Sequence, residues 1–216
     1  MPLTIKDKYI VFDIETDGLL DVTKRFWCGW VYNSTTDEYT GYTVLNDFFD
    51  VLNNYGTNGY NIVGHNICKF DIPALKKLKG ERFNFDVRDV CIDTLVLSRL
   101  IYSNIKDTDI GLMKSGRLPK KLYGSHSLKA YGYRMGELKG TYGEQEDAWN
   151  EFTQDMYDYN RQDVVVTLKL FKKLMSKGYP LKAIQLEHDI AWVMAIQERN
   201  GFVFEKDTAV KLYAQL

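Results

Sequence analysis

Four acidic residues, widely separated along the chain, each stand beside apolar residues that would draw them towards a folded interior: Asp13, Glu15, Asp71 and Asp163. Two carboxylates about 4 Å apart repel each other by roughly 4 kcal/mol at an effective dielectric of about 20. A fold that gathers these four residues at one point therefore needs bound cations, or carboxyl groups that share protons. We favour the interpretation with cations.

The composition allows one sizeable domain and argues against a disulfide scaffold. The chain has 216 residues, enough for a substantial hydrophobic core. Its net charge of −1 gives no support for a general electrostatic attraction to nucleic acid, so an enzyme acting on nucleic acid would bind through a local groove and its metals. Cys28, Cys68 and Cys91 lack Cys-x-x-Cys spacing, which favours reduced thiols over a zinc site.

The chain is expected to divide into a domain of residues 1–180 and a helical segment of residues 181–216. Composition is uniform through the first part, whereas residues 181–200 carry a helical pattern that Gly201 is well placed to end. A new amphipathic pattern is cut off at Leu216, which favours a fragment of something longer. The N-terminus lacks the apolar core of a signal peptide, and no stretch approaches the length of a membrane span, so we expect a cytoplasmic protein without membrane contact.

An alternating pattern predicts a strand over residues 9–15, with Ile10, Phe12 and Ile14 on one face and the first two acids on the other. Turn-forming residues between the next two aromatic-rich runs predict a hairpin. These strands, followed by alternating helices and short strands, predict an α/β fold: a mixed sheet, antiparallel strands first, flanked by helices and resembling the ribonuclease H-like fold. The other predicted elements are strands at 26–32, 38–44 and 61–64 and helices at 46–55, 72–78, 93–102, 125–133 and 152–175.

The spacing of the acids within these elements suits metal binding. Asp13 and Glu15 are two apart on a predicted strand, so both point to one face, about 7 Å apart along the backbone. Tyr159 and Asp163 are four apart on a predicted helix and share a face. Asp71 falls where a short strand gives way to a helix, the kind of junction at which α/β sites collect.

The type of ligand indicates the metal. Carboxylate oxygens without His or Cys partners favour Mg²⁺ or Mn²⁺ over zinc. Two such ions about 3.5–4 Å apart suit in-line attack on a phosphodiester, one activating water and the other stabilising the departing oxyanion. The protein then contributes placement and charge.

Each motif also has a simpler interpretation when it is taken alone. Asp13 and Glu15 are then solvated acids at a turn, and Asp71 is an acid that complements the dipole at a helix N-terminus. Tyr159 and Asp163 are then part of an exposed helix face. All three motifs in order, each at the end or on the face of a predicted element, favour the functional interpretation.

Together these residues resemble a known family. Residues 13–19, 66–71 and 159–163 resemble the Exo I, Exo II and Exo III motifs of the DEDD exonuclease superfamily, in its tyrosine-containing branch. The likeness extends over nearly the whole chain to the proofreading domain of family A replicative DNA polymerases from short-tailed bacteriophages. Further segments that carry it are residues 91–100, 106–109, 124–128, 163–167, 187–188 and 197–202.

The resemblance implies a role for each motif residue. Asp13 would bridge two metal ions, Mg²⁺ or Mn²⁺. Glu15 and Asp163 would hold the ion that carries the nucleophilic water. Asp71 would act chiefly through waters on the second ion, and Tyr159 would orient the attacking water.

The resemblance also implies contacts with substrate. Thr16 and Leu19 match residues that contact the terminal nucleotide in the family, and Asn66 and Phe70 would help to shape the path of a single strand. The stretch 139–149 looks shorter than in the relatives, which puts contacts from that loop in doubt.

The implied function is metal-dependent 3′→5′ exonuclease activity that releases deoxynucleoside 5′-monophosphates from single-stranded or frayed DNA 3′ ends. No polymerase palm, fingers or thumb fits in the remaining residues, so a polymerase domain is expected in a longer parent chain, in the host cell cytoplasm if the protein is phage-encoded. One alternative is a 3′→5′ exoribonuclease of the same superfamily. Another is a DNA-holding domain without catalysis, against which the complete set of acids argues.

A basic run, from Lys114 through Arg117, Lys120 and Lys121 to Tyr123, has two open interpretations. It would track the phosphates of a single strand, with the tyrosine as a stacking platform. Equally, it is a solvated loop.

Overall fold

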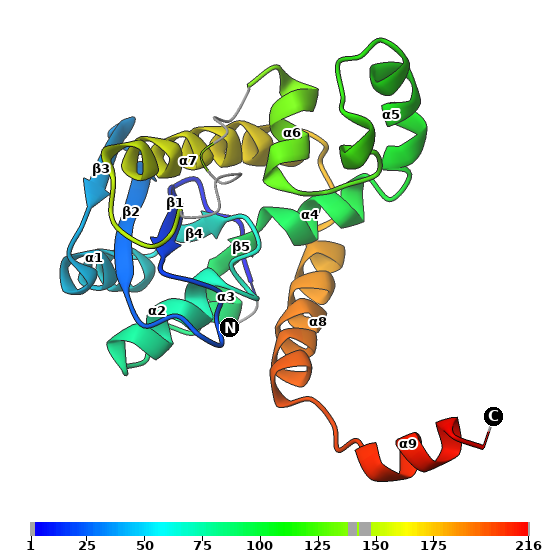
Figure 1. Ribbon diagram of the computed structural model, residues 1–216. Helices are drawn as coiled ribbons and strands as arrows, with labels where there is room; N and C mark the ends of the chain where they lie inside the picture. Colours follow the sequence, from blue (N-terminus) through cyan, green and yellow to red (C-terminus); the bar gives the residue numbers. More distant parts are fainter. Residues whose placement is uncertain (1–2, 138–141, 143–147, 216) are drawn as a thin grey trace.

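A five-stranded mixed sheet forms the centre of the computed structural model, which describes residues 3–137, 142 and 148–215 (Figure 1). The strand order is β3-β2-β1-β4-β5. β1 to β3 pair antiparallel, and β4 and β5 extend the sheet in parallel from β1. The prediction of a mixed sheet with antiparallel strands first is confirmed. The strands are β1 Tyr9–Thr16, β2 Phe26–Asn33, β3 Glu38–Tyr42, β4 Asn61–Gly64 and β5 Cys91–Asp93.

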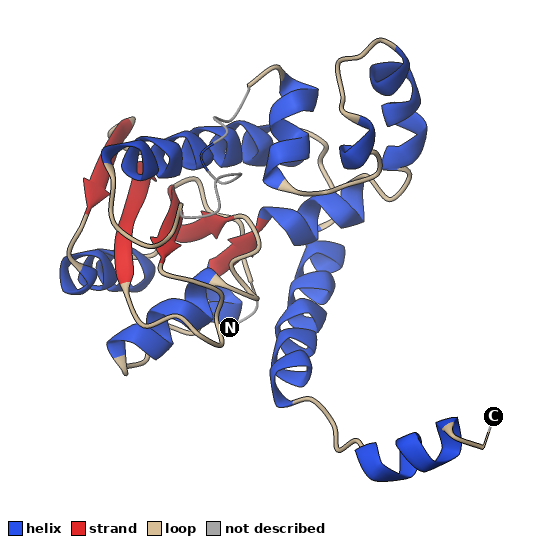
Figure 2. Ribbon diagram, in the orientation of Figure 1, coloured by secondary structure: helices blue, strands red, loops and turns tan. Residues whose placement is uncertain are grey.

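Helices cover both faces of this sheet (Figure 2). α1 (Leu45–Thr57) and α2 (Asp71–Lys79) pack on one face, and the long helix α7 (Gln154–Met175) crosses β1 and β2 on the other. α4 (Thr94–Ile101) and α6 (Leu128–Met135) pack against α7. The result is the predicted α/β arrangement, with β1 between two helical layers.

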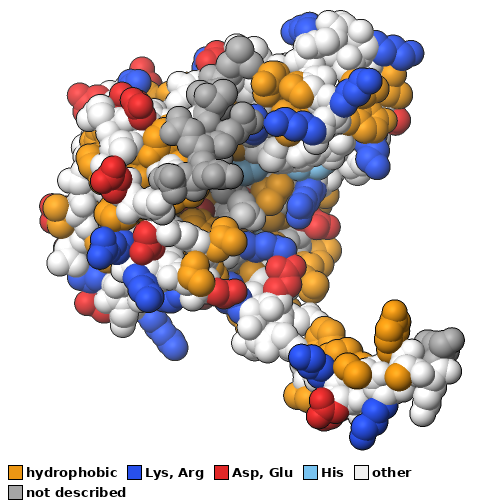
Figure 3. All heavy atoms as spheres, in the orientation of Figure 1, with side chains coloured by type: hydrophobic (Ala, Val, Ile, Leu, Met, Phe, Trp, Pro, Cys, Tyr) orange, Lys and Arg blue, Asp and Glu red, His pale blue; other side chains and the backbone are white. Residues whose placement is uncertain are grey.

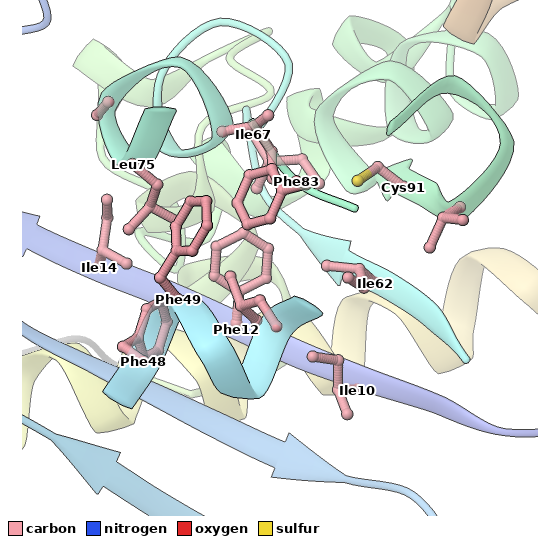
Figure 4. Packing of buried hydrophobic residues seen from close by; sticks show 14 of the residues in the cluster. Ile10, Phe12, Ile14, Phe48, Phe49, Ile62, Ile67, Leu75, Phe83 and Cys91 are labelled. Atoms are coloured by element: carbon pink, nitrogen blue, oxygen red, sulfur yellow. The ribbon is translucent and has the colours of Figure 1, made fainter. Parts of the chain in front are cut away.

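The alternation along β1 divides its side chains between two cores. Ile10, Phe12 and Ile14 pack with α1 and α2, in a cluster that includes Phe48 and Phe49 (Figure 4). Val11 packs on the opposite face with α7. This face is the one predicted for the acids, because side chains two residues apart in a strand point the same way.

The described residues form five further helices. They are α3 Val87–Val90, α5 Ile105–Lys114, the 3₁₀ helix η1 Lys120–Leu122, α8 Leu181–Asn200 and α9 Lys206–Tyr213. α8 packs along α4 and α3, and α9 projects away from the rest of the chain (Figure 1). Within the described residues, no helix is both long and apolar enough to cross a membrane.

The structure corrects several predicted boundaries. β3 ends at Tyr42 instead of residue 44, and β5 ends at Asp93, the residue predicted to begin a helix. The helix predicted at 93–102 begins one residue later, because Asp93 caps it by accepting a hydrogen bond from the amide of Leu95. Ser127 caps α6 in the same way, so this helix begins at Leu128 rather than at residue 125.

Apolar side chains remain exposed on the last two helices. Figure 3 shows them gathered on α9 and on the segment before it. The buried face of α8, in contrast, contributes to the body of the domain through Ile184, His188 and Trp192. The exposed apolar residues of α9 and the segment before it are Phe202, Val203, Phe204, Val210, Leu212 and Tyr213.

Candidate active site

Three acids from opposite ends of the chain meet between the sheet and α7. Asp13 and Glu15 lie near the end of β1 on the face that carries Val11, and Asp163 lies buried on α7. One carboxylate oxygen from each of the three lies within 4.8 Å of the other two. The predicted convergence of these residues is therefore present in the fold.

Asn160 holds one of these carboxylates in place. Its Nδ2 donates a hydrogen bond of 2.7 Å to Oδ2 of Asp13, and its side chain is fully buried. Asn160 precedes Asp163 by three residues, so both project from one face of α7. The sequence reasoning missed this residue, although its spacing from the last acid was the available signal.

Asp71 begins α2 and is buried beside the three-acid cluster, although it is not one of the three residues that meet within 4.8 Å. Burial is the main cause that raises its pKa, and the charges of Asp93 and Asp163 raise it further. A backbone hydrogen bond from Ile14 on β1 opposes this rise. The charge of Asp163 is thus one of the causes that raise the pKa of Asp71, so the fourth acid interacts electrostatically with the three-acid cluster.

Asp93 positions the loop that leads to Asp71. Its Oδ1 accepts from the amide of Asn66 at 2.8 Å, and its Oδ2 accepts from the amide of Cys68 at 3.0 Å. Asn66 has a φ of 66°, in the left-handed region, which this amide bond helps to hold. Asp93 is a second residue missed from sequence, because a cap on one helix gives no sign that it also binds a loop 25 residues away.

Tyr159 lies one turn before Asp163 on the same helix face, as predicted. Its ring packs against two aromatic residues that come from the segment before α7. The ring centroids are 5.9 Å from Tyr142 and 6.5 Å from Trp149. This packing limits where the phenol can point.

A pocket of about 290 Å³ opens directly beside Glu15. Its lining includes Thr16, Leu19 and Phe70, three of the four residues predicted to contact substrate. Trp149 completes it, and the carbonyl of Trp149 accepts a hydrogen bond from the indole of Trp27 at 3.0 Å. Most of the stretch 139–149, which was expected to be short, lies outside the described residues.

Asn66, the fourth predicted contact residue, lines a different cavity, of about 650 Å³. His65, Arg99 and His126 share that cavity. Nδ1 of His65 lies 2.9 Å from Oγ1 of Thr94, and Nδ1 of His126 lies 3.2 Å from Oγ of Ser98. Asn66 also lines a smaller cavity of about 280 Å³ between α4 and α8.

The three-acid cluster suits a hard divalent cation. Oxygen ligands of one octahedral Mg²⁺ lie at most about 4 Å apart, so small side-chain rotations would bring these oxygens to bonding distance. No His or Cys belongs to the cluster among the described residues. Cys28 is paired with Glu15 on the neighbouring strand β2. Burial raises the pKa of its thiol, the charges of Glu15 and Asp13 raise it further, and the thiol therefore stays protonated.

A family model described as RNase_H superfamily matches residues 10–175, which contain the whole sheet and all four acids. The chain belongs to the RNase H superfamily. A solved structure described as the apo form of the nuclease has the same fold, with a TM-score of 0.60 and 17% identity over 90% of this chain and 86% of its own.

Two curated relatives of this RNase H superfamily chain are DNA-directed DNA polymerases. That of Escherichia phage T7 is 43% identical over 246 residues, and that of Enterobacteria phage T3 is 42% identical. Each match covers 96% of this chain and 35% of the relative, so the chain spans about a third of their length. It is a nuclease-like domain related to phage DNA polymerases.

Proposed function

We propose that the chain is a metal-dependent 3′→5′ exodeoxyribonuclease that releases deoxynucleoside 5′-monophosphates from single-stranded or frayed DNA 3′ ends. The observation that carries the proposal is the meeting of Asp13, Glu15 and Asp163 within 4.8 Å, with Asp71 buried beside them. Such a concentration of like charge fits a site that binds Mg²⁺ or Mn²⁺. The ions, when bound, supply electrophilic stabilisation of the phosphoryl oxygens and an activated water.

The residues of the chain supply placement. Asp13, Glu15, Asp71 and Asp163 would hold two ions, and Asn160 fixes the orientation of the Asp13 carboxylate. Tyr159 would orient the attacking water. We propose that the terminal nucleotide binds in the pocket lined by Thr16, Leu19, Phe70 and Trp149. The indole of Trp149 would be a stacking surface for its base.

Selectivity for a frayed end follows from access to this pocket. The terminal nucleotide has to leave the duplex before it reaches Glu15, and a mismatch lowers the free energy needed to melt the last base pairs. Asn66 would contact the strand further from its end, since it lines a separate cavity.

The relatives support a wider context for this activity. We propose that residues 1–180 form the nuclease domain and that residues 181–216 lead towards a polymerase domain. The domain would then proofread newly made DNA in the cytoplasm of a host cell. The identity with phage DNA polymerases over 96% of this chain supports this part of the proposal.

Digestion of a 5′-labelled single-stranded DNA oligonucleotide tests the activity. With Mg²⁺ we expect a ladder that shortens from the 3′ side, and with EDTA or the variant Asp13→Ala we expect none. An intact oligonucleotide in all lanes would support the DNA-holding alternative instead. Faster degradation of a matched RNA would support the ribonuclease alternative and reject the choice of DNA.

A further inference from the structure

A further pocket, of about 270 Å³, is lined by residues of α5, α6 and α7 and of the segments that directly follow α4 and α7. Lys173 and Lys177 stand at its rim, near the end of α7 and just beyond it. Ten residues separate Asp163 from Lys173, which is about 15 Å along the helix at 1.5 Å per residue. The pocket is therefore separate from the candidate active site.

The wall of this pocket carries two hydrogen-bond donors without partners. The hydroxyl of Tyr102 and Nη1 of Arg134 are both buried, and neither has a hydrogen-bond partner among the described residues. Burial raises the pKa of Tyr102, so its phenol remains a donor. A buried donor that bonds neither protein nor water destabilises the folded state, and a ligand that accepts its hydrogen removes that penalty.

The rest of the Arg134 guanidinium is fixed. Nε and Nη2 each bond Asp109 at 2.8 Å, and Nη2 also bonds the carbonyl of Ser125 at 2.7 Å. Asp109 is fully buried, and its pKa lies below the usual value because these bonds outweigh the effect of its burial. This pair sets the guanidinium in one orientation, so Nη1 is the remaining donor.

All the described charged residues that line the pocket are basic. Arg134, Lys173 and Lys177 line it, and no Asp or Glu does so among the described residues. Asp109, which does not line the pocket, compensates the charge of Arg134. The described lining of the pocket offers no such counter-charge to Lys173 and Lys177. Thr108 adds no donor, because its hydroxyl already bonds the carbonyl of Ile105 at 2.8 Å.

We propose that this pocket is an oxyanion site that accepts a phosphate group. Phosphate offers several strong acceptor oxygens to the donors of Tyr102, Arg134 and the two lysines, and charge-assisted bonds to Arg and Lys are the stronger ones in proteins. The volume of about 270 Å³ leaves room for a phosphate group, whether free or carried by a nucleotide. Either free inorganic phosphate or the phosphate of a nucleotide presents this chemistry.

Calorimetric titration of the 216-residue chain with inorganic phosphate tests the proposal. Chloride holds the ionic strength constant, and EDTA prevents binding through metal ions at the acids. The triple variant Tyr102→Phe, Lys173→Met, Lys177→Met should bind phosphate at least about tenfold more weakly than the wild type. Lys182→Met, an exposed lysine outside the pocket, is the matched control and should change affinity by less than about twofold.

Equal affinity of the wild type and the triple variant would overturn the proposal, as would equal weakening by Lys182→Met. A second arm uses thymidine 5′-monophosphate under the same conditions. The triple substitution leaves the nucleotide pocket beside Glu15 intact, so the comparison is the affinity that the triple variant loses for each ligand. A larger loss for the nucleotide identifies a nucleotide-borne phosphate as the ligand, and a larger loss for inorganic phosphate identifies the free ion. No loss for either ligand overturns the assignment.

Thermal unfolding of Tyr102→Phe alone gives an independent check that does not depend on the lysines. Without phosphate, this variant should unfold at a temperature at least as high as the wild type, because it removes an unpaired buried hydroxyl. Phosphate should then raise its midpoint less than it raises that of the wild type. A phosphate-induced rise equal to that of the wild type would show that the hydroxyl does not contact the anion.

Discussion

Asn160 determines the position of one oxygen of Asp13, and its effect should appear in metal affinity. Removing a group that orients a metal ligand typically weakens metal binding by about 10- to 100-fold. We expect Asn160→Ala to raise the Mg²⁺ concentration for half-maximal DNA cleavage by about tenfold or more, with a smaller change in rate at saturating Mg²⁺. The Mg²⁺ dependence of the initial rate measures this effect.

Asn104→Ala is the matched control for that measurement. Asn104 is exposed at the start of α5, and its side chain makes no capping hydrogen bond. It should leave the Mg²⁺ dependence unchanged. If Asn160→Ala lowered the rate equally at all Mg²⁺ concentrations, the hydrogen bond to Asp13 would not act through the metal.

Tyr159 should affect the rate of the chemical step rather than metal binding. Tyr159→Phe keeps all four carboxylates and removes the hydroxyl proposed to orient the attacking water. We expect the single-turnover rate to fall by about 10- to 100-fold without reaching zero. Tyr213→Phe, exposed on α9, serves as the control. An unchanged single-turnover rate in Tyr159→Phe would remove the tyrosine from the mechanism.

At the scale of single residues, the sequence predicted the acids better than their supports. Alternation places Asp13 and Glu15 on the right face of β1, and helical spacing places Tyr159 near Asp163. Asp93 and Asn160 act through bonds to residues 25 to 147 positions away, and no local pattern encodes those pairings. The roles of Asp93 and Asn160 can therefore be identified only from the three-dimensional structure.

At the scale of elements, β5 and α5 were not predicted, for different reasons. β5 has three residues, too few for a period, and takes its strand form from pairing with Ile62 to Gly64 of β4. α5 buries only Ile105 and Asp109, and the second of these is charged. Its apolar pattern is therefore weak, because Arg134 on α6 replaces a hydrophobic partner.

α8 is joined to the sheet by His188, which gives this contact a pH dependence. Nε2 of His188 accepts a hydrogen bond from the amide of Asp93 at 2.9 Å, and Nδ1 lies 2.7 Å from the carbonyl of Ile184. Burial lowers the pKa of His188 in the folded protein. The unfolded chain therefore binds a proton first as pH falls, so this stability is present above about pH 6.5 and is lost as pH falls through the folded pKa.

Urea unfolding at pH 7.5 and pH 5.0 tests the role of His188. The wild type should lose more free energy of unfolding over this interval than His188→Gln, at a slope of at most about 1.4 kcal/mol per pH unit for one proton. Glutamine still offers an acceptor to Asp93 but does not titrate, and His126 contributes equally to both proteins. The same loss in both would assign the pH dependence to other groups.

At the scale of the whole molecule, the acids join the two ends of the domain. β1 begins at Tyr9 and α7 ends at Met175, so an ion held by Asp13, Glu15 and Asp163 connects the first strand to the last helix of the matched region. The connection lies between β1 and α7. Metal binding should therefore stabilise the domain as a unit, since an ion that binds only the folded chain shifts the unfolding equilibrium.

The unfolding midpoint should accordingly depend on Mg²⁺. At a concentration tenfold above the dissociation constant, binding adds about 1.4 kcal/mol to the free energy of unfolding. For a chain of this size that corresponds to a rise of about 3–6 °C over the value in EDTA. Asp13→Ala should show no rise, whereas Asp21→Ala, which removes an exposed acid outside the cluster, should rise like the wild type. An equal rise in Asp13→Ala would show that the Asp13 carboxylate is not a ligand of the ion that stabilises the domain.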